Sequence, residues 1–205
     1  MIEPNEKPQI ILGKSLEILK ELGTNSVDCV ITDPPYIGFE GMETPNAYVD
    51  WFKQHFIEMQ RVCRNPKSIV VSQPRHRFRT FMQNFGFKTA IKITDAMEDK
   101  RGDDAFFLCQ TDNLPEPMPK PEHWPNDLIT ASSHSNARNI NKMSIVVKAI
   151  SRPGDIILDP FCGSAAIGIA GILLGRKYIG VEMDEARAKD ALIRIENVLS
   201  LTSSY

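Results

Sequence analysis

The chain has 205 residues, of which 42% are hydrophobic and 24% are charged, and both fractions are ordinary for one globular domain. A formal net charge of −2 excludes a uniformly basic protein, so any nucleic-acid-binding surface has to be local. The sequence has neither an apolar run of about 18 residues nor a secretory leader, so no membrane span or export is expected. The four cysteines form no CxxC pair, which argues against a zinc site or disulfides and favours a cytoplasmic protein without a metal.

Strand and helix signals alternate through the first half of the chain. Residues 9–12 and 28–32 have the apolar, β-rich composition of buried strands. Between them, residues 15–22 carry apolar side chains at helical spacing, and Ser15 is the expected N-cap of that helix. The other elements predicted in this half are helices over 46–63 and 75–85 and strands over 68–73, 88–94 and 104–110.

The second half begins with a change in composition. Five prolines between Pro115 and Pro125 predict an irregular connection over 111–135. Because strands alternate with helices almost throughout the chain, we expect an α/β fold in which a mostly parallel sheet has helices on both faces. The elements predicted after the connection are helices over 141–151, 164–174 and 184–199 and strands over 155–159 and 177–182.

A candidate cofactor site follows the strand at 155–159, where the sequence reads DPFCGS. The strand ends at Asp159, and a turn that contains Gly163 then opens a helix. In open α/β sheets, ligands bind beyond the carboxyl ends of the strands, and glycine lets the backbone approach them closely. The next strand brings Glu182 to the same edge, where a carboxylate can accept hydrogen bonds from both hydroxyls of a ribose. This pairing favours an adenosine-type ligand over an ordinary strand–turn–helix.

A candidate catalytic site lies in VDCVITDPPY, where Asp33 ends a buried strand. An exocyclic amine of a base is a poor nucleophile because its lone pair is delocalised into the ring. A carboxylate and a neighbouring backbone carbonyl can each accept one N–H and orient the nitrogen, and two prolines preorganise the loop that carries them. A tyrosine ring can stack on the base. The alternative is a proline-stiffened turn in which Asp33 caps a helix.

Together these motifs resemble the DNA amino-methyltransferases of the permuted class, in which the catalytic motif precedes the cofactor motif. DPPY comes first, DPFCGS follows, and VEMD at 181–184 is last. The resemblance implies a seven-stranded, Rossmann-like methyltransferase sheet, S-adenosylmethionine as cofactor and a base flipped out of DNA as substrate. DPPY is the form most often linked to N6 of adenine. We therefore expect one domain over 1–205, with a catalytic half (1–110), the proline-rich connection (111–135) and a cofactor half (136–205).

The site residues are carried over from the matched positions. The residues implied to grip the base are Asp33, Pro34, Pro35 and Tyr36. The residues implied to hold the cofactor are Asp159, Pro160, Phe161, Cys162, Gly163, Ser164 and Glu182. Near the methionine carboxylate of the cofactor we expect Asn141, Lys142 and Ser144, in a segment that keeps only the lysine of the family pattern.

Two alternative functions stay open. Family members usually have an aspartate where this chain has Lys14, and that aspartate contacts the adenine of the cofactor. This departure and the altered segment 139–144 support a non-catalytic nucleic-acid-binding subunit. The other alternative keeps the chemistry and changes the substrate to N4 of cytosine in DNA or N6 of adenine in RNA.

The expected DNA-binding surface is small. We expect no full target-recognition domain in this chain. Its densest basic cluster consists of Arg75, Arg77 and Arg79, which we expect to contact phosphates. Because one small chain offers little area for a DNA interface, we expect either recognition of a very short sequence with low affinity or, as the favoured alternative, assembly of two copies as a homodimer.

Overall fold

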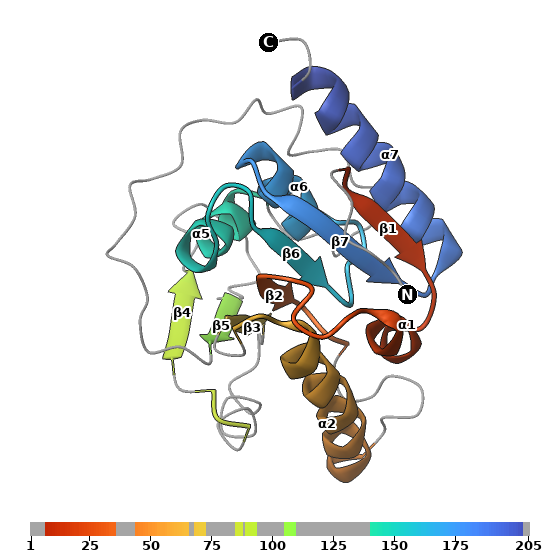
Figure 1. Ribbon diagram of the computed structural model, residues 1–205, viewed down its shortest axis with the longest axis vertical. Helices are drawn as coiled ribbons and strands as arrows, with labels where there is room; N and C mark the ends of the chain where they lie inside the picture. The colour runs from red at the N-terminus through yellow and green to blue at the C-terminus, as the bar shows by residue number, and fades with distance from the viewer. Residues whose placement is uncertain are drawn as a thin grey trace, which may run out of the picture.

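A seven-stranded β-sheet forms the centre of the protein, with the strands in the order β1–β7–β6–β2–β3–β5–β4 (Figure 1). This computed structural model describes residues 7–35, 44–65, 68–72, 85–87, 89–93, 105–109 and 140–202. The strands that pair in parallel are β1 (Gln9–Leu12), β7 (Lys177–Glu182), β6 (Ile156–Asp159), β2 (Cys29–Thr32) and β3 (Ile69–Ser72). Two strands at one end pair antiparallel: β5 (Ala105–Cys109) with both β3 and β4 (Thr89–Ile93). The prediction of a mostly parallel sheet is confirmed.

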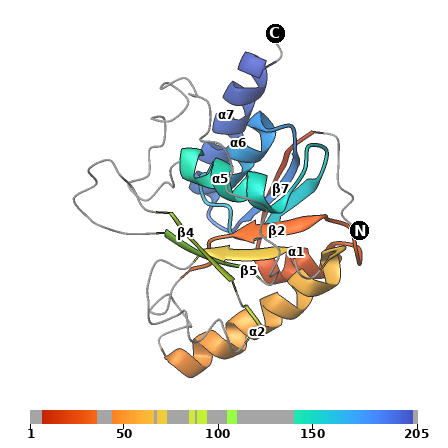
Figure 2. The same cartoon turned by 90° about the vertical axis from the view of Figure 1, so that its left-hand side faces the viewer.

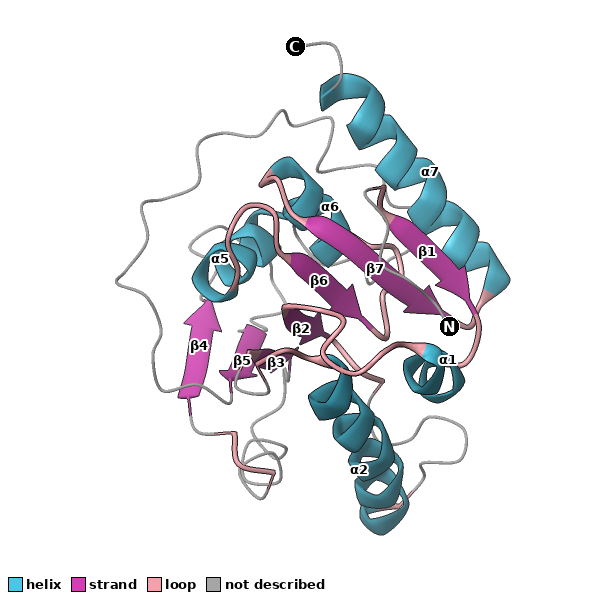
Figure 3. Cartoon of the chain, in the orientation of Figure 1, coloured by secondary structure: helices cyan, strands magenta, loops and turns pink. Residues whose placement is uncertain are grey.

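Helices cover both faces of this sheet, as predicted. On one face lie α1 (Ser15–Glu21) and α2 (Pro45–Val62). On the other face lie α5 (Ile140–Ile150), α6 (Ala166–Leu173) and α7 (Glu185–Thr202). Figure 2 shows the two helical layers on either side of the strands, and Figure 3 shows how helices and strands alternate. Among the described helices, none has the length and apolar content needed to cross a membrane.

Each central strand contributes to two hydrophobic cores, because successive side chains point to opposite faces of a sheet. In β2, Val30 packs in the core beneath α1 and α2, whereas Cys29 and Ile31 pack in the core beneath α5, α6 and α7. All three side chains are almost completely buried. Burial on both faces explains why the parallel strands read as continuous apolar runs in the sequence.

The helix starts follow ordinary capping rules in one case and depart from the prediction in another. Helix α2 has Pro45 in its first turn and Thr44 as N-cap, whose side chain accepts a hydrogen bond from the backbone N–H of Ala47. The predicted N-cap of α1 is wrong: Lys14 occupies that position without a side-chain cap, and Ser15 is the first helical residue. The hydroxyl of Ser15 instead lies 2.9 Å from Nε2 of His55 in α2.

Some predicted segments cannot be compared with the structure. The helix expected over 75–85 lies outside the described residues except for Phe85, which lies in a turn. The proline-rich connection also lies outside the described residues. The predicted elements that the structure does describe are confirmed within a few residues at their ends.

Pairing between β2 and β6 joins the two halves of the chain. Cys29 pairs with Ile157 and Val30 with Leu158, in parallel register. The strand that leads to DPPY therefore lies directly beside the strand that leads to DPFCGS, although the two motifs are far apart in sequence. This neighbour relation sets the geometry of the candidate site.

Candidate cofactor and catalytic site

Three loops meet at one edge of the sheet, where parallel strands β2, β6 and β7 have their carboxyl ends. Asp33 follows β2 and is partly exposed, whereas the next residue, Pro34, is buried. Pro35 is partly exposed, and Tyr36 lies outside the described residues. The structure thus brings the start of the predicted catalytic motif to the same edge as the predicted cofactor motif.

The loop after β6 has two residues in the left-handed region of backbone conformation. Gly163 has φ +50°, and a β-carbon added there would meet no atom within 4 Å, so a ligand can approach this part of the backbone closely. Ala165 has φ 58° and ψ 36° and is fully buried. The guanidinium of Arg194, a buried residue of α7, donates to the carbonyl oxygen of Ser164 and so holds the end of this loop.

Glu182 ties the loop after β7 to the loop after β6. One oxygen of its carboxylate accepts a hydrogen bond from the backbone N–H of Gly163 at 2.9 Å. The other accepts from the backbone N–H groups of Met183 and Asp184, also at 2.9 Å. A carboxylate has about four acceptor positions, so this one retains capacity for about one further strong donor. Met183, beside it, is an apolar side chain with 63% exposure, which leaves an open apolar surface next to that carboxylate.

Asp159 lies deeper than Glu182, with only 1% of its surface exposed. Its Oδ1 accepts hydrogen bonds from the hydroxyl of Thr32 at 2.7 Å and from the backbone N–H of Phe161 at 3.2 Å. The hydroxyl of Tyr178 donates to Oδ2 at 3.4 Å. Burial raises the pKa of this carboxyl to about 7; the hydrogen bonds from Thr32 and Phe161 oppose the rise and the nearby charge of Asp33 adds to it.

An aromatic cluster from α2 borders the cofactor loop. The ring of Phe161 lies 5.3 Å from the rings of both Trp51 and His55, which are 4.3 Å apart. Nδ1 of His55 donates to the carbonyl oxygen of Trp51 at 2.8 Å, so Nε2 accepts from the hydroxyl of Ser15. Burial lowers the pKa of His55, which keeps this ring neutral. His55 was not among the site residues expected from the sequence; its i, i+4 spacing from Trp51 is the signal that places both on one helix face.

The three residues predicted from α5 have different surroundings. Asn141 and Lys142 are partly exposed. Ser144 is completely buried, and its hydroxyl donates to the carbonyl oxygen of Asn141 at 2.7 Å. That bond lies within the first turn of the helix, so the hydrogen of Ser144 is already used. The arginines predicted to bind DNA (Arg75, Arg77 and Arg79) lie outside the described residues.

Known methyltransferases are similar to this chain over most of its length. The family model described as DNA methylase matches residues 97–192. The type II methyltransferase M2.MboI of Moraxella bovis is 40% identical over 225 aligned residues, covering 85% of this chain and 82% of the relative. The DNA adenine methyltransferase YhdJ of Escherichia coli (strain K12) is 24% identical over 249 residues, covering 94% of this chain and 84% of YhdJ.

A solved structure supports the assignment of the fold. The M1.HpyAVI–SAM complex superposes with a TM-score of 0.68 at 23% sequence identity. The match covers 91% of this chain and 98% of that chain. The α/β sheet with helices on both faces is therefore the sheet of a methyltransferase.

Proposed function

Because this chain belongs to the DNA methylase family, we propose that it transfers a methyl group from S-adenosylmethionine to the exocyclic N6 amine of adenine in DNA. The observation that carries the proposal is the adjacency of two loops at the carboxyl edge of the sheet. Asp33 follows β2 directly, the cofactor loop follows β6, and these strands are hydrogen-bonded neighbours. An amine held at Asp33 is thereby close to a cofactor held by the adjoining loop.

The cofactor residues fit an adenosylated ligand. Glu182 has residual acceptor capacity for a ribose hydroxyl, and Gly163 has open space in front of its backbone. Lys142 and Asn141 supply polar groups for the methionine carboxylate from α5. The remaining members of the proposed cofactor set are Pro160, Phe161, Cys162, Ser164 and Ser144, whereas Asp159, which the family resemblance also implies, is only 1% exposed and has protein partners on both oxygens.

The proposed catalytic contribution of this chain is orientation. S-adenosylmethionine supplies an electrophilic methyl group: a C–S bond breaks, a C–N bond forms, S-adenosylhomocysteine leaves and the nitrogen loses one proton to solvent. Asp33 and a neighbouring backbone carbonyl each accept one N–H of the amine, which directs its lone pair out of the ring plane. Buried Pro34 and its neighbour Pro35 hold these acceptors in place, and Tyr36 stacks on the base. Fixed positions of the reacting atoms supply much of the rate.

The proposed DNA contacts come from the segment that follows β3. This strand runs parallel to β2, so the chain leaves it at the same edge of the sheet, before Arg75, Arg77 and Arg79. We propose that these arginines bind phosphates, that the chain is a small member of the permuted class without a separate recognition domain, and that a second copy in a homodimer adds further DNA-binding surface.

Product analysis tests the proposed reaction. The protein is incubated with S-adenosylmethionine labelled in the methyl group and with either duplex DNA or RNA of mixed sequence, and the nucleosides are analysed by mass spectrometry after digestion. We expect label in N6-methyladenine from DNA alone. Label in N4-methylcytosine, or in RNA, identifies one of the other substrates. Absence of label favours the non-catalytic subunit, whether or not calorimetry detects binding of S-adenosylmethionine.

A further inference from the structure

A buried hydrogen bond links the two motif strands at the candidate site. The hydroxyl of Thr32 donates to Oδ1 of Asp159 across the β2–β6 pair at 2.7 Å. Thr32 is the residue immediately before Asp33, and it is completely buried. The bond therefore joins the last residue of the cofactor strand to the last residue of the strand that carries Asp33.

We propose that Asp159 is a positioning residue of methyl transfer, which fixes the carboxyl end of β2, and hence Asp33, through the hydroxyl of Thr32 instead of binding the cofactor. The inference rests on the proposed function for the identity of the reaction. It changes the role expected for Asp159 from the family resemblance and gives Thr32 a role that no motif assigns.

The hydrogen bonds of Asp159 support this role. Both of its oxygens have partners within the protein: Thr32 and the N–H of Phe161 at Oδ1, and the hydroxyl of Tyr178 at Oδ2. With 1% exposure, the carboxyl group has almost no surface to offer a ligand. Glu182 also accepts three hydrogen bonds within the protein, but it is 8% exposed and lies beside open apolar surface, so its remaining acceptor capacity can reach a ligand.

The third partner of Asp159 is itself held firmly. Tyr178 is buried against Gly168 of α6, where an added β-carbon would come within 2.3 Å of its ring. The ring therefore has little freedom to move away from Asp159. Donors from β2, β7 and the cofactor loop thus hold both oxygens of Asp159, as a group that transmits position requires.

The charge of the Asp159 carboxyl group changes within the physiological pH range. The titratable groups that face Asp159 are Asp33 from the end of β2, Tyr178 from β7 and Cys162 from the cofactor loop. Burial raises the pKa of Asp159 to about 7. Above this pH the carboxylate accepts a stronger, charge-assisted bond from Thr32, so the position of Asp33 becomes better defined. We expect kcat to rise with pH through about 7 for this reason.

The test compares substitutions at both ends of the bond. Thr32→Val removes the hydroxyl with little change of volume, and a displaced loop costs about tenfold to a hundredfold in kcat. Thr32→Ser restores the donor and recovers most of that loss. Asp159→Asn keeps an acceptor oxygen for Thr32 without the charge, so it retains the acid-side kcat and loses the rise through pH 7. The double variant is expected to be no slower than Thr32→Val alone.

A matched control and two binding measurements make the result specific. Ser72→Ala removes a buried hydroxyl at the carboxyl end of the adjoining strand β3, and its kcat stays within about twofold of wild type. Calorimetry is expected to give S-adenosylmethionine affinities within about threefold of wild type for both Thr32→Val and Asp159→Asn. Thermal unfolding of each variant sets a temperature at which all of them are folded.

Two outcomes overturn the inference. One is a more than tenfold loss of cofactor affinity in Asp159→Asn, which makes Asp159 a direct ligand. The other is an unchanged kcat in Thr32→Val. If the wild-type protein transfers no methyl group, the proposed function fails, and amide hydrogen exchange decides the structural part. Faster exchange at residues 32–33 in Thr32→Val, but not in Ser72→Ala, supports the bond as the anchor of this loop, and equal exchange refutes it.

Discussion

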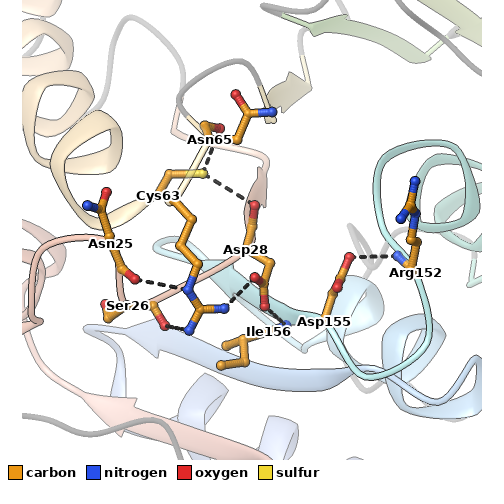
Figure 4. A network of polar contacts seen from close by, with 9 residues as sticks. Asn25, Ser26, Asp28, Cys63, Asn65, Arg152, Asp155 and Ile156 are labelled. Atoms are coloured by element: carbon orange, nitrogen blue, oxygen red, sulfur yellow. Dashed lines mark hydrogen bonds and ion pairs between the residues drawn. The ribbon is translucent and has the colours of Figure 1, made fainter.

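An aspartate links strands β2 and β6 at each end of the pair, and the two aspartates have opposite surroundings. At the amino end, Asp28 forms an ion pair with Arg64. It also accepts a hydrogen bond from the backbone N–H of Ile156 at 2.8 Å (Figure 4). At the carboxyl end, Asp159 accepts hydrogen bonds from two hydroxyls and one backbone N–H. The first carboxylate is one quarter exposed and has a cation beside it; the second is buried, with another carboxylate nearby.

The two ends of this strand pair therefore have different expected roles: the amino end in stability and the carboxyl end in activity. Arg64 also donates to the backbone carbonyl oxygens of Asn25 and Ser26, so its guanidinium closes the loop before β2. Asp155, which precedes β6, accepts from the backbone N–H of Arg152. At this edge Asp28, Arg64 and Asp155 have partners within the protein, whereas at the carboxyl edge Gly163 and Glu182 retain room for a ligand. Substitutions at the amino edge should therefore change the free energy of unfolding, and those at the carboxyl edge should change activity.

The largest expected effect is at Asp33. Asp33→Ala removes an acceptor that orients the amine, and loss of one preorganised group of this kind costs about a hundredfold or more in kcat. Affinity for S-adenosylmethionine and the melting temperature should stay close to wild type. Single-turnover methyl transfer and calorimetry measure the two quantities on the same preparation. Activity near that of wild type would remove Asp33 from the proposed catalytic set.

The second effect concerns cofactor affinity. Glu182→Ala removes a charged acceptor for a ribose hydroxyl, and hydrogen bonds to charged groups contribute about 1.5–3 kcal/mol each. We expect S-adenosylmethionine to bind at least about tenfold more weakly, as measured by calorimetry. Glu182→Gln is the matched control: it keeps one acceptor oxygen and should lose less affinity. A folded Glu182→Ala protein with unchanged affinity would place this carboxylate outside the cofactor site.

The third effect is at the amino edge and should appear in stability alone. Asp28→Ala leaves the partly buried N–H of Ile156 without its acceptor and the guanidinium of Arg64 without its counter-charge, which costs about 1 kcal/mol or more. Asp28→Asn keeps the acceptor for Ile156 and is expected to cost less. Urea unfolding gives the free energies, and kcat measured on folded protein should match wild type. A large fall in kcat for Asp28→Asn would show that the two edges are coupled.

The fourth effect concerns the salt dependence of DNA binding. If Arg75, Arg77 and Arg79 contact phosphates, replacing all three with glutamine should reduce the slope of log affinity against log salt by about 0.9 for each lost contact. Arg152→Gln is the control, because Arg152 precedes β6 at the amino edge and is exposed. Fluorescence anisotropy with a labelled duplex at several salt concentrations measures both slopes. An unchanged slope in the triple variant would show that this cluster does not contact DNA.

The positions of the site loops could be predicted from the sequence because they depend on periodicity and chain direction. Apolar runs identified the parallel strands, and each motif follows one of them, so the motifs had to meet at the carboxyl edge. Asp33, Gly163 and Glu182 reach that edge as expected. What these patterns establish is where a strand ends, and that is sufficient to place a loop.

The partners of individual side chains could not be predicted in this way. Thr32 and Asp159 are 127 residues apart, and their bond depends on β2 lying beside β6, which no local pattern specifies. Ser15 was predicted as a helix cap from local rules, but it pairs with His55, 40 residues away. Arg194 reaches the cofactor loop from the last helix for the same reason. Side-chain partners of this kind follow from tertiary packing and become visible only when the elements are placed in space.

The smallest expected effect concerns backbone strain, which differs between the two edges. In the described chain, the non-glycine residues with positive φ are Asn25 at the amino edge and Ala165 at the carboxyl edge. Asparagine adopts this conformation readily, whereas for alanine it costs about 1–2 kcal/mol. In Ala165→Gly, relief of that strain is offset by a lost buried methyl group, about 0.8 kcal/mol, and by a more flexible unfolded chain. We expect its stability to change by less than about 1 kcal/mol. Ala166→Gly, at the first residue of α6, has no strain to relieve and should be destabilised by about 1 kcal/mol or more. Urea unfolding of both variants measures the difference, and equal losses would show that Ala165 stores no strain in the cofactor loop.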